Sequence, residues 1–276
     1  TGCSHTSPRG DGQMGESFRL HVTYAEATTL PATMIAKLPS PNEDMRSMVG
    51  GAYKAELSLY RVYAPRLAVR APQVHYMAAS PDHSSFVLLL EDLAPRQQGD
   101  QIDGCGPYRA EHAVVNLAGL HAGTWCDPTL VDNEWLNLDT EESAAMTGEF
   151  FDGAVDLFVE RMGHAFGPTD VALLRDIAAA LPAWLLGRRE RFALIHGDYR
   201  LDNLMFPVDP DDSDVVALDW QTQAIGLPTR DVAYMLETAL EPDVRRASED
   251  DLVAAYHGAL LAHGVEGYPL HLCFED

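Results

Sequence analysis

The chain has 276 residues, of which 46% are hydrophobic and 22% are charged, and these values are typical of a globular protein with one large domain or two lobes. Its formal net charge of −23 argues against a nucleic-acid partner, because the phosphates would be repelled. The acidic residues are spread along the chain, so they indicate either a solvated surface or a preference for cationic ligands.

No apolar run approaches the roughly 20 residues of a membrane-spanning helix, so we expect no membrane partner. There is no signal-peptide pattern of a basic start followed by an apolar run. The four cysteines are far apart in the sequence and form no Cys-x-x-Cys pair. Together these observations favour a cytoplasmic location.

The first pattern along the chain is rich in glycine, because Gly10, Gly12 and Gly15 fit G-x-G-x-x-G. This pattern alone is weak evidence of a nucleotide site. Residues 18–24 alternate between apolar and polar side chains and predict a strand, whereas a dinucleotide-binding loop would open a helix. With a short strand expected over residues 3–9, the glycine segment becomes a flap between strands. Its backbone N–H groups can lie over phosphates, since no Cβ obstructs them.

A second strand is predicted over residues 33–38, and Lys37 is its only charged residue. Lys37 is either an edge-strand lysine that reaches water or a ligand of phosphate. Residues 48–63 predict a helix that carries Glu56. Glu56 is either exposed or brought to Lys37 by packing of this helix on the sheet, where it would hold the ammonium group on nucleotide phosphates.

A hairpin of residues 74–78 and 85–90 runs into an acidic segment that begins at Glu91. This change in composition is typical of a boundary between lobes. We therefore expect a nucleotide-binding lobe over residues 1–92 and a catalytic and acceptor-binding lobe over residues 93–276.

The second lobe is predicted to be mainly helical. Apolar periodicity predicts helices over residues 108–124, 141–163, 169–187, 232–240 and 249–263. We interpret His121, on the first of these helices, as a packing or hydrogen-bonding residue and not as a ligand. Asp231 is either a helix N-cap or a buried side chain that holds the backbone of a loop, and both roles are structural.

The most informative stretch lies between residues 194 and 221, where polar side chains interrupt an apolar hairpin. Asp198 follows the first strand, Asn203 comes five residues later, and Asp219 closes the next strand. Single Asp and Asn residues are ordinary in turns. Two carboxylates and an amide at strand ends, however, form a hard-oxygen site suited to Mg²⁺ and phosphate. Their order and spacing are those of the kinase catalytic loop and its metal-binding Asp.

The ordered set of motifs resembles the aminoglycoside phosphotransferase and choline kinase-like family, which has the protein-kinase-like fold. His-Gly-Asp-x-x-x-x-Asn followed by Asp-Trp-Gln is most similar to the ecdysteroid-kinase-like and bacterial phosphotransferase branch. The resemblance spans nearly the whole chain. It implies an α+β fold with two lobes, in which an N-terminal antiparallel sheet with one helix precedes a larger, mainly helical C-terminal lobe.

The resemblance also implies ATP and Mg²⁺ as cofactors and a small-molecule hydroxyl acceptor as partner. Asp198 would orient the acceptor hydroxyl or accept its proton, and Asn203 and Asp219 would hold the metal. Arg200 either reaches the transferring phosphoryl group or faces solvent. The remaining residues would bind the nucleotide, through its phosphates or through the adenine: Gly10, Gly12, Gly15, Lys37, Glu56, Glu91 and Leu93.

Two departures from protein kinases indicate a small acceptor. Gly197 stands where protein kinases have Arg, and the interval from Asp219 to Asp231 is too short for a peptide-docking activation segment. We therefore expect a permanently assembled site. The acceptor stays open between an aminoglycoside, a macrolide, a choline-like amine and a sterol-like alcohol. Two other functions are also open: a kinase-like binding module without catalysis, and a metal-dependent hydrolase that uses His196.

Overall fold

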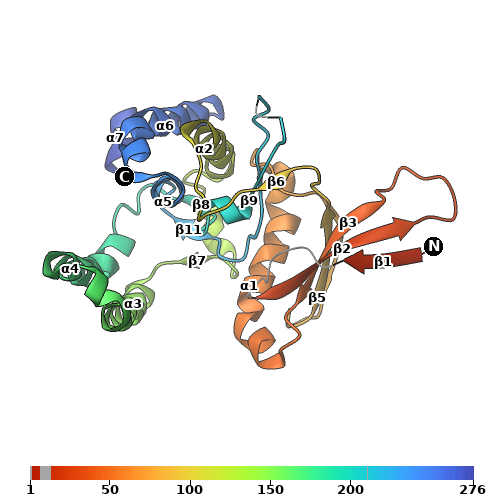
Figure 1. The fold of residues 1–276 in the computed structure, drawn as a ribbon, viewed down its shortest axis with the longest axis horizontal. Coiled ribbons are helices and arrows are strands. Elements are labelled where there is room, and N and C mark those ends of the chain that lie inside the picture. Colours follow the sequence, from red (N-terminus) through yellow and green to blue (C-terminus); the bar gives the residue numbers. More distant parts are fainter. Residues whose placement is uncertain (1, 7–13, 210) are drawn as a thin grey trace.

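The computed structural model describes residues 2–6, 14–209 and 211–276. Figure 1 shows an antiparallel sheet at the N-terminal end of the chain, one long helix beside it, and a mainly helical C-terminal part. This α+β arrangement is the one expected from the sequence. Within the described residues, no helix is both long enough and apolar enough to cross a membrane.

The N-terminal sheet has the strand order β1-β2-β3-β5-β4, and its neighbouring strands are antiparallel. The strands are β1 (Gly2–Thr6), β2 (Gly15–Thr23), β3 (Thr33–Pro39), β4 (Val74–Ala79) and β5 (Phe86–Glu91). Apolar side chains of β5 alternate with less buried ones, and Phe86, Leu88 and Leu90 are buried. Because β3 lies between β2 and β5, its residues are central in the sheet.

Helix α1 (Glu43–Val62) lies between the sheet and the C-terminal part (Figure 1). It is fixed to the sheet by Tyr53, whose ring centroid is 4.8 Å from that of Phe86. The helix begins five residues earlier than the periodicity predicts, because Asn42 caps it by accepting a hydrogen bond from the Met45 N–H at 3.1 Å. The capped first turn is polar, so apolar periodicity could not reveal it.

The C-terminal part contains two groups of helices (Figure 1). Helices α2, α5, α6 and α7 gather at one end, while α3 and α4 pair with each other. Their bounds are α2 (Pro107–Ala122), α3 (Glu141–Met162), α4 (Pro168–Leu185), α5 (Thr229–Ala239), α6 (Pro242–Ala262) and α7 (Leu270–Glu275). Helix α6 begins seven residues before its predicted start, with Pro242 in its first turn, and α7 was not predicted.

Two small sheets carry the segments that hold the polar residues. One has the order β10-β9-β6, and the other has the order β7-β11-β8. Their strands are β6 (Gln97–Gln98), β7 (Asn137–Leu138), β8 (Ala193–Ile195), β9 (Leu204–Phe206), β10 (Val216–Ala217) and β11 (Ala224–Gly226). The single hairpin predicted for residues 194–218 is therefore wrong, since β8 pairs with β11 while β9 pairs with β10.

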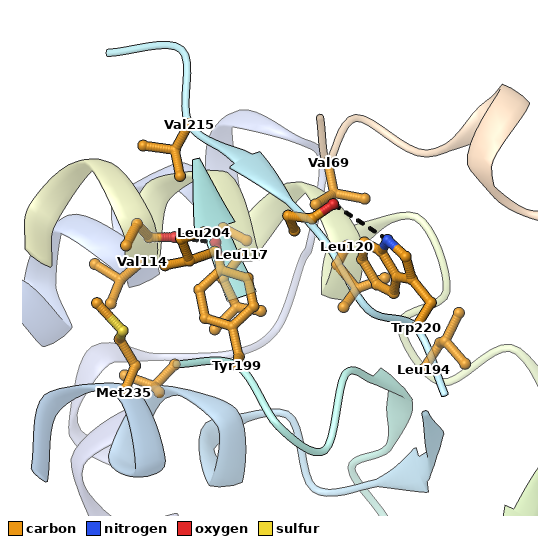
Figure 2. Packing of buried hydrophobic residues seen from close by; sticks show 14 of the residues in the cluster. Val69, Val114, Leu117, Leu120, Leu194, Tyr199, Leu204, Val215, Trp220 and Met235 are labelled. Atoms are coloured by element: carbon orange, nitrogen blue, oxygen red, sulfur yellow. Dashed lines mark hydrogen bonds between the residues drawn. The ribbon is translucent and has the colours of Figure 1, made fainter. Parts of the chain in front are cut away.

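A hydrophobic core joins these small sheets to α2. Trp220 and Tyr199 are fully buried in it, in one cluster with Leu117, Leu120 and Leu194 (Figure 2). The Trp220 indole N–H donates to the Ala217 carbonyl at 3.2 Å, and the Tyr199 hydroxyl donates to the Ala113 carbonyl at 2.8 Å. Each aromatic residue directly follows an Asp, namely Asp219 and Asp198. The core therefore fixes the backbone beside both carboxylates.

Candidate active site

Lys37 joins the N-terminal sheet to the C-terminal part. Its Nζ lies 2.8 Å from Glu56 Oε1 and 3.0 Å from Asp219 Oδ1, and its side chain is only 15% exposed. It stands on β3, paired on one side with Ser17 of β2 and on the other with Leu88 of β5. Lys37 is thus a central-strand residue and not the edge-strand lysine that the sequence also allowed.

The environment of Lys37 keeps its amine charged. Burial alone would lower the pKa of the ammonium, because a charged group loses its hydration. The nearby carboxylates of Glu56 and Asp219 outweigh this effect, and the pKa of Lys37 is raised above its usual value. A permanently positive group therefore faces the carboxylate of Asp219, which is 43% exposed.

Glu56 is almost fully buried, at 1% exposure, and both of its carboxylate oxygens have partners. Oε1 contacts Lys37, and Oε2 accepts a hydrogen bond from Gln221 Nε2 at 3.0 Å. The sequence interpretation did not assign a role to Gln221. The one sequence feature that could have marked Gln221 is its place in Asp-Trp-Gln, two residues after Asp219.

Gly197 allows the backbone to turn sharply between β8 and Asp198. Its φ of +79° is in the region that favours glycine. A Cβ at this position would lie 2.4 Å from the Thr222 carbonyl oxygen. Two further contacts join the same segments, because Thr222 Oγ1 donates to the His196 carbonyl at 3.0 Å and the Leu218 N–H donates to the Asn203 carbonyl at 2.8 Å. The loop around Asp198 and the segment around Asp219 therefore form one unit.

His196 has a structural role. It is fully buried, and its Nε2 lies 2.9 Å from the Leu218 carbonyl, to which it must donate because a carbonyl can only accept. Its Nδ1 then accepts from the Asp198 N–H at 3.3 Å. Both ring nitrogens are used within the protein, so the hydrolase hypothesis loses the ligand it requires.

Asp231 holds the backbone of the Asp198 loop, which is one of the two roles that the sequence allowed. It is 2% exposed, and its carboxylate accepts from the His196 N–H at 2.6 Å and from the Gly197 N–H at 2.9 Å. Pro228 occupies the N-cap position of α5 instead. Burial would raise the pKa of Asp231, but the hydrogen bond and charge of His121 and the His196 N–H hold it below its usual value.

His121 continues this chain of hydrogen bonds into the helical core. Its Nε2 is 3.3 Å from Asp231 Oδ2, and its Nδ1 is 2.7 Å from the Tyr256 hydroxyl of α6. His121 is fully buried. The expectation of a hydrogen-bonding histidine is confirmed.

The carboxylate of Asp198 is held by three side chains. Asn203 Nδ2 donates to Oδ2 at 2.9 Å, the Tyr234 hydroxyl donates to Oδ1 at 3.1 Å, and Arg200 Nε lies 3.3 Å from Oδ1. Arg200 also contacts Asp202, with Nη1 3.0 Å from Oδ2, so its guanidinium group bridges two acids of the loop. Asp198 remains 31% exposed, which leaves its carboxylate accessible from one side.

Tyr234 is a residue that the sequence did not reveal. It lies on α5, three positions after Asp231, and no motif marks it. Burial, followed by the charge of Asp198, raises the pKa of the Tyr234 phenol. The phenol therefore stays protonated and remains a hydrogen-bond donor to Asp198.

Asp219 and Asn203 offer oxygen atoms of the kind that Mg²⁺ prefers. Asp219 adopts a φ of +57°, a left-handed conformation that Asp tolerates better than most residues. Asn203 is 8% exposed and uses its amide N–H groups on the side chain and carbonyl of Asp198, so its side-chain oxygen is the atom suited to a metal.

Within the part of the chain that the structure describes, no group of three or more His, Cys, Asp and Glu side chains is arranged to hold a metal. Mg²⁺ usually takes one or two protein ligands and completes its shell with phosphate oxygens and water. The donor set of Asn203 and Asp219 fits this mode of binding.

Two of the remaining predicted nucleotide ligands, Gly15 and Glu91, lie at ends of strands in the N-terminal sheet. Gly10 and Gly12 are outside the described residues. Gly15 begins β2, where a Cβ would lie 2.7 Å from the Leu38 carbonyl oxygen, so glycine is needed for close strand pairing. Glu91 ends β5, and both of its carboxylate oxygens lie 2.8 Å from Arg70 Nη2.

The connector after β5 contributes only part of its backbone to internal hydrogen bonds. The Glu91 N–H donates to the Gln73 carbonyl at 2.8 Å, and the carbonyl of Leu93 accepts from the Arg96 N–H at 2.9 Å. Leu93 itself is buried. The side chain of Leu93 is therefore used in packing.

The antiparallel sheet with α1 and the mainly helical C-terminal part together form a protein-kinase-like fold. The family model described as ecdysteroid kinase-like matches residues 9–265. The chain belongs to the ecdysteroid kinase-like family.

Two curated relatives match short segments. The chain is 49% identical over 55 residues to mouse acyl-CoA dehydrogenase family member 10, a match that covers 18% of this chain and 5% of that protein. It is 37% identical over 76 residues to chicken acyl-CoA dehydrogenase family member 11, covering 27% and 10% respectively. The chain thus matches only a small part of the length of these relatives.

Solved structures share the fold at low sequence identity. Choline kinase from Cryptosporidium parvum has a TM-score of 0.63 and 9% identity, over 98% of this chain and 77% of that one. The GDP and kanamycin complex of APH(2")-IIIa has a TM-score of 0.60 and 15% identity, over 92% and 81%. Amicoumacin kinase hAmiN, in complex with AMP-PNP and Ca²⁺, has a TM-score of 0.52 and 12% identity, over 94% and 71%.

Proposed function

We propose that this protein transfers the γ-phosphate of ATP, in the presence of Mg²⁺, to a hydroxyl group of a small molecule. The observation that carries the proposal is the 3.0 Å contact between Lys37 Nζ and Asp219 Oδ1. It brings a largely buried cation of the sheet to an accessible carboxylate beside the loop of Asp198 and Asn203. Positive charge, oxygen ligands for a metal and a carboxylate base are the groups that phosphoryl transfer requires.

The nucleotide would lie between the sheet of residues 1–92 and the part formed by residues 93–276. Lys37, held by Glu56, would bind its phosphates through the charged ammonium group. The backbone of Gly10, Gly12 and Gly15 would cover the phosphates. The adenine would bond to the backbone of the connector at Glu91 and Leu93.

Asp219 and the side-chain oxygen of Asn203 would hold Mg²⁺. When bound, the ion supplies positive charge that neutralises the phosphate oxygens during transfer. The relatives that contain GDP or AMP-PNP support nucleotide binding by this fold.

Asp198 would orient the acceptor hydroxyl and receive its proton. Its two oxygens are fixed by Asn203 and Tyr234, so the exposed side of the carboxylate has a defined direction. Arg200 is adjacent and positively charged, and it would turn from Asp202 toward the transferring phosphoryl group. No large rearrangement is required, because the Lys37–Glu56 pair is already formed.

We propose a small hydroxyl compound as the acceptor and the cytoplasm as the location of the protein. Solved relatives include a kanamycin complex and a choline kinase, and the family is named for its likeness to ecdysteroid kinases. These names, together with the macrolide that the sequence also leaves open, define a test panel of an aminoglycoside, choline, a macrolide and an ecdysteroid.

The experiment incubates the purified protein with Mg²⁺, ATP and each compound, and measures ADP release together with the mass of the product. An increase of one phosphate group in the mass of an acceptor supports the proposal, provided that Asp198→Asn slows its formation by about 10²–10⁴-fold. Binding of Mg²⁺–ATP with no transfer to any compound would instead favour a binding module. Hydrolysis of a substrate without ATP would contradict the proposal.

A further inference from the structure

Four side chains near the proposed phosphate site are joined by three contacts, and the backbone between two of them completes a ring. Lys37 Nζ contacts Asp219 Oδ1 at 3.0 Å and Glu56 Oε1 at 2.8 Å, and Gln221 Nε2 contacts Glu56 Oε2 at 3.0 Å. The ring closes through the backbone, since Gln221 is two residues after Asp219. The segment that carries the proposed metal ligand therefore also holds the partner of the lysine.

Losing the hydrogen bond from Gln221 would leave one oxygen of the buried Glu56 carboxylate without a donor. Glu56 is 1% exposed and Gln221 is 7% exposed, so solvent cannot readily replace the amide. A buried carboxylate oxygen without a donor is unfavourable, and the group relieves this by moving or rotating. Either movement changes the position of the oxygen that faces Lys37.

We propose that Gln221 is a positioning residue for nucleotide binding, which acts through Glu56 to fix the ammonium group of Lys37. This inference rests on the proposed function, because it concerns the same phosphate site. It assigns Gln221 an effect on nucleotide affinity in addition to any effect on stability. The effect passes along named atoms, from Gln221 Nε2 to Glu56 and from Glu56 to Lys37 Nζ.

The chain provides a matched control at Gln223. Its Nε2 donates to the Ala55 carbonyl at 2.6 Å and to the Trp220 carbonyl at 2.9 Å, and the side chain is 3% exposed. Gln223 thus links the same segment to the same helix α1, one residue away from Glu56. It bonds only to backbone carbonyls, so its loss should weaken packing without releasing the Glu56 carboxylate.

The experiment compares wild type, Gln221→Met and Gln223→Met, because Met has a similar length but no hydrogen-bond donor. Thermal unfolding without nucleotide measures stability, and isothermal titration calorimetry measures the Kd for Mg²⁺–ATP. We expect both variants to lose stability and only Gln221→Met to raise Kd, by about ten-fold. Gln221→Asn keeps the amide but is too short to reach Glu56, so it should raise Kd in the same direction if Gln221→Met does not fold.

A double variant tests the route of the effect. If Gln221 acts through Lys37, then Gln221→Met should have little further effect on Kd in a Lys37→Met background. The inference is overturned if Gln221→Met and Gln221→Asn bind Mg²⁺–ATP like wild type, if Gln223→Met weakens binding equally, or if the double variant shows additive losses. A wild-type protein that binds no nucleotide would contradict the proposed function itself.

Discussion

Lys37 Nζ lies 3.0 Å from Asp219 Oδ1, although the two residues are 182 positions apart in the chain. Lys37 belongs to the antiparallel N-terminal sheet, whereas Asp219 lies just after Leu218, beyond the end of β10 in the small sheet that also contains β9. The contact therefore spans the two parts of the molecule. It places the proposed phosphate-binding cation next to a carboxylate that is accessible to a metal.

Replacing Lys37 by Met should weaken the binding of ATP. The loss of one charge-assisted contact to phosphate is worth about 1.5–3 kcal/mol, which corresponds to a roughly 10–100-fold higher Kd. Calorimetric titration with Mg²⁺–ATP measures this change. Lys54→Met is the matched control, because Lys54 lies on α1 at 39% exposure and only approaches Glu134 at 4.0 Å. Equal affinities of the two variants for Mg²⁺–ATP would show that Lys37 does not bind the nucleotide phosphates.

Replacing Asp198 by Asn should reduce turnover and leave ATP binding nearly unchanged. The variant keeps the shape of the side chain and the contact with Tyr234 but loses the base, and such losses lower kcat by about 10²–10⁴-fold. Steady-state kinetics with an accepted compound from the panel, together with a nucleotide titration, separate the two effects. Full turnover by the variant would exclude Asp198 as the base.

Replacing Gly197 by Ala should disturb the Asp198 loop. The new Cβ would lie 2.4 Å from the Thr222 carbonyl oxygen, and the backbone φ of +79° is unfavourable for alanine by about 1–2 kcal/mol. The backbone has to shift, so we expect a lower melting temperature and at least a ten-fold loss of kcat. Gly153→Ala is a suitable control, because a Cβ there meets no atom within 4 Å. Similar melting temperatures and kcat values of the two variants would show that the turn at Gly197 accepts a Cβ.

Asp231 should make stability depend on pH. Because its pKa is lowered in the folded protein, its contribution is fully present above the unfolded pKa of about 3.9 and is lost as the pH falls through the lower folded pKa. Replacing it by Ala leaves the N–H groups of His196 and Gly197 without their acceptor and should cost about 3–5 kcal/mol.

Denaturant unfolding of wild type and Asp231→Ala between pH 2 and pH 7 checks this expectation. The difference in the free energy of unfolding should be constant near neutral pH and should shrink in acid. A difference that stays constant down to pH 2 would show that the charge of Asp231 does not stabilise the fold.

The sequence predicted the long strands of the N-terminal sheet well, because their alternation is a local pattern. The alternation in β2 and the polar residues after β8 and near β10 are visible in the residues themselves. Lys37 could be recognised as a site residue only as a member of that ordered set. Its central position in the sheet, which excludes the edge-strand interpretation, depends on pairing with β2 and β5.

Other features were invisible because they depend on contacts between distant segments. Strands β8 and β9 have three residues each, too few to show which partner they select, so the predicted hairpin was wrong. Tyr234 contacts Asp198 only because α5 packs behind the loop. Gln221 contacts Glu56 across 165 positions in the chain, and nothing near either residue indicates this hydrogen bond.

The dependence of ATP affinity on Mg²⁺ tests the central claim most directly. Calorimetric titrations of wild type and Asp219→Asn, each with and without Mg²⁺, compare the same nucleotide in four conditions. The proposed site predicts that Mg²⁺ tightens binding to wild type and that Asp219→Asn loses about 10–100-fold of the affinity for Mg²⁺–ATP. Binding by wild type that does not respond to Mg²⁺, or an Asp219→Asn variant that binds Mg²⁺–ATP like wild type, would contradict it.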